Sequence, residues 1–260
     1  MKSYGLLGSW LRPAVLVAGA LQIAGCVTTV EGNAPEQASD AERVIAHVDL
    51  ARGYLAEGNY MRARSPLDKA LSLDPNAVEA NVLMAVVHQS EEEFELARQF
   101  YRRALRSDPS NAQALNNYGS FLYARGDHQE AAKHLRRAVA DVAYPARAQA
   151  FENLGLAELS LQREDAAVKA FERALMLNNS QPRTNLELAD IYYARGNVPL
   201  ALGYYNQFRG NAQPSPRSLC LGMKLSAALG LDDQLASYTL ALRNLFPGSP
   251  EANACEIRRG

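Results

Sequence analysis

Residues 44–77 read VIAHVDLARGYLAEGNYMRARSPLDKALSLDPNA, with apolar residues at helical spacing on both sides of Gly58-Asn59 and a break at Asp74-Pro75. Apolar residues three and four positions apart indicate an amphipathic helix, and glycine and proline mark its ends. The stretch therefore predicts two antiparallel helices joined by a tight turn. The pattern returns along the chain, with starts near residues 44, 78, 112, 148, 182 and 216. A period of about 34 residues predicts an all-α solenoid in which each helix pair stacks on the next.

Small residues recur at matching places in these units. An alanine or glycine in each first helix and an alanine in each second helix let the two helices approach closely, while tyrosine, phenylalanine or leucine fills the remaining gap. The set includes Ala51, Ala85, Gly119, Gly155 and Ala189 in first helices, and Ala63, Ala97, Ala131, Ala167 and Ala201 in second helices. These positions resemble the tetratricopeptide repeat consensus. The resemblance implies a right-handed superhelix of six repeats over residues 44–249, with a C-terminal cap at 250–260.

The chain begins with features of an exported lipoprotein. Residues 14–24 form a mostly apolar run that is too short to span a bilayer, so residues 1–25 are expected to be a signal peptide. The sequence Ile23-Ala24-Gly25-Cys26 resembles a lipobox, which implies that Cys26 is acylated and becomes the first residue of the mature chain. A cysteine that merely follows a signal or an uncleaved anchor is the alternative. Residues 26–43 are then expected to be a flexible tether.

The residue after the lipidated cysteine bears on location. Val27, and not aspartate, follows Cys26. By the sorting habit of such lipoproteins, this implies lipid anchoring in the outer membrane of a Gram-negative cell, facing the periplasm. In that oxidising compartment Cys220 and Cys255, which fall at similar places in neighbouring first helices, are candidates for a disulfide that staples the end of the solenoid. Two buried free thiols remain the alternative.

Composition and motifs argue against several functional classes. The formal net charge of −1 gives no basic excess for nucleic acid. The four histidines are spread over different repeat positions with no acidic partner at metal or triad spacing, and no phosphate loop or hydrolase motif is present. We therefore expect no enzyme activity, no metal, no cofactor and no small-molecule substrate.

A partner is expected on one stripe of the first helices, because positions 2, 5, 9 and 12 of this repeat class lie on one helical face turned away from the second helix. This groove stripe comprises Ile45, Val48, Arg52, Leu55, Val82, Val86, Gln89, Asn116 and Tyr123. Its mixture of apolar and polar groups suits a peptide with apolar anchors. The other possibility is that the tether or the helix curvature covers the apolar positions. Glutamate at Val48 or Val82 is expected to leave melting unchanged and to abolish binding.

Lipobox, tether and six repeats together resemble the type IV pilus biogenesis lipoproteins of the PilF/PilW pilotin family. The resemblance spans the whole chain and implies binding to the pilus secretin subunit. It also implies help with the secretin's outer-membrane localisation and multimerisation, and hence a role in pilus biogenesis and twitching motility. The alternative is a repeat lipoprotein adaptor that docks peptidoglycan hydrolases or envelope assembly factors.

Overall fold

The computed structural model describes residues 38–255. The predicted signal peptide (1–25), the lipidation site Cys26 and most of the predicted tether lie outside the described residues. The described helices all belong to one compact unit, Ala38–Gly260, which also contains the whole of the described core.

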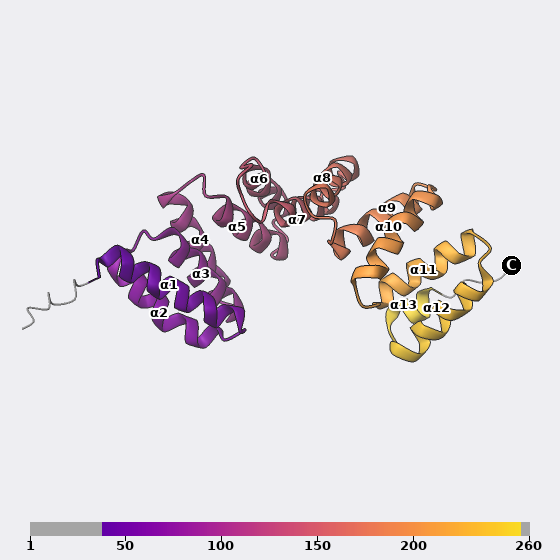
Figure 1. Ribbon diagram of the computed structural model, residues 1–260, viewed down its shortest axis with the longest axis horizontal. Helices are drawn as coiled ribbons and strands as arrows, with labels where there is room; N and C mark the ends of the chain where they lie inside the picture. Colours follow the sequence, from indigo (N-terminus) through magenta and orange to yellow (C-terminus); the bar gives the residue numbers. More distant parts are fainter. Residues whose placement is uncertain (1–37, 256–260) are drawn as a thin grey trace, which may run out of the picture. The chain divides into compact units, whose positions relative to one another are not determined.

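The described part is all-α, and its helices follow one another along the chain in pairs (Figure 1). Six pairs form the six predicted repeats, which confirms the fold class. In chain order the pairs are α1 (Asp40–Ala56) with α2 (Tyr60–Leu73), α3 (Val78–Ser90) with α4 (Phe94–Ser107), α5 (Ala112–Ala124) with α6 (His128–Ala138), α7 (Arg147–Ser160) with α8 (Glu164–Leu177), α9 (Pro182–Ala194) with α10 (Val198–Asn211), and α11 (Pro216–Ala228) with α12 (Asp232–Leu245). A short helix, α13 (Pro250–Ala254), follows at the predicted cap.

The first helix begins earlier than the sequence analysis expected. The tether was predicted to run to Arg43, whereas α1 starts at Asp40. The cause is a capping box: the Ser39 hydroxyl accepts a hydrogen bond from the Glu42 N–H, and the Glu42 carboxylate accepts one from the Ser39 N–H at 2.7 Å. Both bonds satisfy backbone donors that a helix start otherwise leaves free, so they extend the helix toward the N-terminus.

The small residues have the expected packing role. A Cβ atom added at Gly119 of α5 would lie 2.6 Å from the Leu135 side chain of α6, and one added at Gly155 of α7 would collide with the Phe171 ring of α8. Both large side chains are fully buried. Close approach at these points lets each helix pair bury its apolar faces, and the next pair completes the core.

Among the described residues, no helix combines the length and the apolar character needed to cross a bilayer.

Candidate functional site

The nine residues of the groove stripe fall into three groups in the structure. Val48, Val82 and Asn116 are buried, while Leu55, Val86, Gln89 and Tyr123 are half-buried and Ile45 and Arg52 are exposed. The stripe is therefore not the uniformly accessible surface that helical geometry alone predicts.

Val48 and Val82 do not line an accessible surface, contrary to prediction. Val82 is only 1% exposed and lies in the same buried cluster as Ala85 and Tyr118, and Val48 packs in the cluster of Ala51 and Leu67. The physical reason is that first helices touch across repeats: α1 contacts α3, and α3 contacts α5. The fifth position of a first helix faces this contact and is covered. Glutamate at either site would bury a charge, so from the structure we expect it to lower the melting temperature.

Asn116 is also buried, and its amide joins two repeats. Its Nδ2 donates to the Tyr144 hydroxyl at 3.3 Å, and its Oδ1 accepts from Asn153 Nδ2 at 3.0 Å. Burial raises the pKa of Tyr144, which keeps the hydroxyl protonated. Asn116 thus has a structural role between the third and fourth repeats.

Ion pairs join successive first helices at two places, one in the first two repeats and one in the last two. Arg52 of the first repeat contacts Glu79 of the second at 2.5 Å, and Asp190 of the fifth repeat contacts Arg217 of the sixth. Each pair joins position 9 of one repeat to position 2 of the next. The hydrogen bond that Arg52 donates to Glu79 raises the pKa of Arg52, whereas burial raises the pKa of Asp190 above its ordinary value. Arg217 also binds the buried Glu187 at 2.7 Å.

Four apolar side chains of the groove stripe keep accessible surface. Ile45 is 61% exposed, and Leu55, Val86 and Tyr123 keep part of their surface. They come from three successive first helices, α1, α3 and α5. Apolar side chains at this spacing offer anchoring contacts for the apolar residues of a bound polypeptide.

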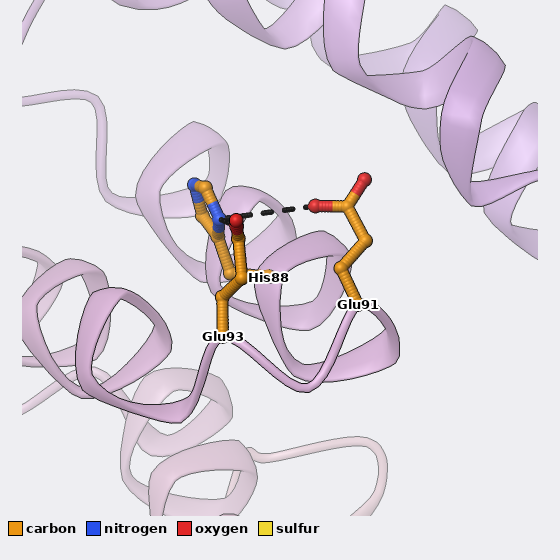
Figure 2. A group of neighbouring side chains, drawn as sticks. All are labelled: His88, Glu91 and Glu93. Carbon is orange, nitrogen blue, oxygen red and sulfur yellow. Dashed lines mark hydrogen bonds and ion pairs between the residues drawn. The ribbon is translucent and has the colours of Figure 1, made fainter.

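A histidine and two carboxylates meet at the turn between α3 and α4 (Figure 2). His88 Nδ1 lies 2.5 Å from Glu93 Oε2 and 3.9 Å from Glu91 Oε2. The expectation that no histidine shares an acidic partner is therefore wrong for His88. The turn after α3 reverses the chain within five residues and returns Glu93 to the end of the helix. The hydrogen bond from His88 lowers the pKa of Glu93.

These three side chains could in principle supply ligands to a divalent cation, since their ligand atoms lie within 4.8 Å of one another. An arginine of the protein already forms ion pairs with both carboxylates. The Arg64 guanidinium of α2 contacts Glu91 directly and lies 3.7 Å from Glu93. His88 itself is buried and stacks on Phe100 at 5.1 Å. The arrangement works as a charged joint between the first and second repeats.

The structure brings Cys220 and Cys255 together. Their Cα atoms are 5.7 Å apart and their sulfur atoms are joined. This Cα separation lies in the usual range for a disulfide. Cys255 follows α13 and packs against Leu219 and Met223 of the sixth repeat, so the bridge would tie the cap to the last repeat.

A family model for the tetratricopeptide repeat matches residues 48–112, 83–144, 119–182 and 165–216. The type IV pilus assembly protein PilF of Pseudomonas aeruginosa strain PAO1 is 41% identical over 243 residues, which is 93% of this chain and 96% of that protein. The chain belongs to the PilF/PilW family of type IV pilus assembly proteins. Members of this family are repeat scaffolds and not enzymes.

Two solved structures of the PilF/PilW family agree with the fold described above. The structure of Pseudomonas aeruginosa PilF has a TM-score of 0.81 and 42% identity, and the match covers 83% of this chain and 97% of that one. The structure of PilW, described as a widely conserved type IV pilus biogenesis factor, has a TM-score of 0.71 and 27% identity, with 81% and 97% covered. The shared fold thus extends over nearly all of both relatives.

Proposed function

We propose that this PilF/PilW family member is an outer-membrane lipoprotein that binds the secretin subunit of the type IV pilus system. It promotes outer-membrane localisation and multimerisation of the secretin. The observation that carries the proposal is the 41% identity to a type IV pilus assembly protein over 93% of the chain. A protein-binding scaffold in pilus assembly needs a partner, and the secretin is the component that must reach the outer membrane and oligomerise there.

The membrane affinity of the expected lipid anchor supports this role. One acyl chain gives only marginal membrane binding, with an association constant of about 10⁴ M⁻¹, and stable anchoring takes a second signal. A fully processed lipobox cysteine at position 26 carries several chains. Anchored in this way, the repeats would carry a bound secretin subunit to the outer membrane without any chemical step.

The apolar part of the groove stripe is the proposed contact for the secretin. Ile45 and Val86 leave apolar surface accessible, and burial of such side chains supplies most of the binding energy in peptide-binding grooves. The buried members of the stripe, Val48 and Val82, hold the helices that present these side chains.

The membrane part of the proposal is tested by Cys26→Ala in cells. We expect the variant protein to leave the outer membrane and the secretin to be mislocalised or unassembled, with loss of surface pili. Membrane fractionation and gels that preserve secretin multimers give the readout. Normal secretin multimers with a displaced lipoprotein would contradict the proposal and favour a different envelope adaptor.

The binding surface is tested with Ile45→Asp and Val86→Asp. Both should lower affinity for the purified secretin subunit by about tenfold or more, because a hot-spot residue contributes at least about 2 kcal/mol. Leu240→Asp is the matched control, since Leu240 is an exposed apolar residue on α12, a second helix. If all three variants bound the secretin as tightly as the parent protein and melted at the same temperature, the secretin would bind at another surface.

A further inference from the structure

A cleft of about 500 Å³ opens between two inter-repeat loops, at the end opposite the turns within each helix pair. One wall is the loop between α6 and α7, where the 36-residue spacing of the third repeat inserts two extra residues. The other wall is the end of α8 and the loop that leads into α9. We call it the loop cleft; its walls include Val142, Tyr144, Arg147, Gln149, Leu177 and Arg183.

The loop cleft carries two cationic side chains. Arg147 Nε donates to the Val139 carbonyl at 2.9 Å, and its guanidinium lies 5.4 Å from the Phe151 ring centroid. Arg183 is exposed and forms no ion pair within the described part of the chain. One acid, Glu152, also lines the cleft, but it is buried and accepts hydrogen bonds from Thr184 at 2.7 Å and from Gln149 at 3.1 Å. Positive charge therefore dominates the accessible surface of the cleft.

Protruding apolar side chains form the rim of the loop cleft. Val142 is 77% exposed and Leu177 is half exposed, and both line the cleft; the neighbouring Met176 is 74% exposed. A single exposed apolar residue needs no explanation, but several gathered beside two arginines do. Apolar side chains beside arginine and lysine are the pattern of proteins that lie on a membrane surface.

We propose that the loop cleft and its rim dock on an anionic phospholipid bilayer. Val142, Met176 and Leu177 enter the headgroup layer, where their apolar surface leaves water. Arg147 and Arg183 pair with lipid phosphates, because guanidinium groups bind phosphate oxygens in a planar, two-pronged geometry. A soluble anion would satisfy the arginines alone and leave the apolar rim in water, so a lipid surface accounts for both features.

This inference rests on the proposed function only in placing the protein at a membrane. The docking itself needs neither the lipid on Cys26 nor the secretin. It supplies a second membrane contact, which together with an acyl anchor holds the repeats against the bilayer. The vesicle experiment below uses neither, so its failure would leave the pilotin proposal standing.

The test measures binding of residues 26–260 with Cys26→Ser, which cannot be lipidated at that position, to vesicles by co-sedimentation. We expect binding to vesicles that contain phosphatidylglycerol, weakening at high salt, and little binding to phosphatidylcholine alone. Because each basic residue near an anionic surface contributes about a factor of five to membrane affinity, Arg183→Glu should lower the partition coefficient about tenfold or more. Met176→Asp should also lower it by removing an inserted apolar group.

Met61→Asp is the matched control for Met176→Asp. Met61 is 72% exposed and also lies on a second helix, but near the N-terminal end of α2 and outside the cleft. Unchanged binding in Met61→Asp, with a loss in both Arg183→Glu and Met176→Asp, supports the proposal. Absence of binding to anionic vesicles would overturn the proposal, and so would an equal loss of binding in Met61→Asp. The proposal would also fail if free inorganic phosphate abolished vesicle binding and Met176→Asp bound the vesicles as tightly as the parent.

Discussion

Glu92, in the turn of the second repeat, has the same left-handed backbone conformation as Gly126, 34 residues later in the turn of the third repeat. Their φ angles are 61° and 83°. The turn geometry of the repeat demands a positive φ whichever residue stands there. Glycine reaches this region without cost, whereas a residue with a Cβ atom is strained. Gln162 of the fourth repeat, with φ 58°, shows the same substitution.

Glu92→Gly and Gln162→Gly should therefore stabilise the fold, each by about 0.5–1 kcal/mol, since relief of strain exceeds the added chain entropy of glycine. Urea unfolding of the purified protein gives the measurement. Gly196→Ala is the matched control: its φ is 76°, and a Cβ atom there meets nothing within 4 Å. It should destabilise by a similar amount through strain alone. A loss of stability in the glycine variants would contradict the argument.

Much of the fold could be predicted from the sequence because packing of the repeat is periodic. The 34-residue spacing placed all six helix pairs, and Gly119 and Gly155 marked the close approaches. What periodicity could not show is which face of a helix its neighbour covers. Position 5, occupied by Val48 and Val82, was assigned to the accessible stripe, because contact between successive first helices depends on the tilt between repeats.

The charged joint at His88 was missed for a related reason. From the sequence, glutamates 91–93 were interpreted as part of a solvated turn. Only the chain reversal after α3 brings Glu93 back to His88. The lack of glycine at that turn was the one available signal. In this turn Glu91 also contacts Arg64 of the preceding repeat.

Val82→Glu is expected to unfold or strongly destabilise the protein, by about 3 kcal/mol or more, because it buries an unpaired carboxylate where no water can reach it. Val86→Glu on the same helix is the comparison, since that side chain keeps part of its surface accessible. Circular dichroism melting should show a large loss for the first and a small change for the second. Equal melting temperatures would contradict the burial of Val82.

Gly155→Ala should destabilise by about 1–3 kcal/mol, because the new methyl group collides with the fully buried Phe171 ring, which cannot rotate away. Gly53→Ala in α1 is the control, as a Cβ atom there meets nothing within 4 Å. That change should stabilise by up to about 1 kcal/mol through helix propensity. Chemical denaturation gives the change in the free energy of unfolding for each variant. Changes of opposite sign would support the close approach of α7 and α8, and changes of the same sign would refute it.

The Cys220–Cys255 pair predicts a bridge that closes a loop with a sequence separation of 35 residues. If it forms in the mature protein, Cys220→Ser with Cys255→Ser should cost about 3–4 kcal/mol in the chain-entropy model. Thiol labelling of the denatured protein, with and without a reductant, tests the bridge directly. Reductant should lower the stability of the native protein and leave that of the double variant unchanged. Free thiols without reductant would rule the bridge out.

Acidification should weaken the fold through His134. Burial lowers the pKa of this histidine below its ordinary value, against the opposing effect of Glu130 and with further lowering from Arg137 and Lys133. The ring packs on Tyr118 at 4.8 Å, and its Nδ1 atom is buried without a hydrogen-bond partner among residues 38–255. A folded-state pKa below the unfolded one means that the unfolded chain binds the proton first. The stability that His134 contributes is fully present above the unfolded pKa, about 6.5, and is lost as pH falls from there through the lower folded-state pKa.

His134→Phe keeps a ring against Tyr118 and removes the titration. The free energy of unfolding, measured in urea between about pH 7.5 and about pH 5.5, should fall less in this variant than in the parent. The window lies above the carboxyl range, so loss of ion pairs contributes little to the difference, and the other three histidines are common to both proteins. An identical decline in parent and variant would show that His134 is protonated as readily in the folded chain as in the unfolded one.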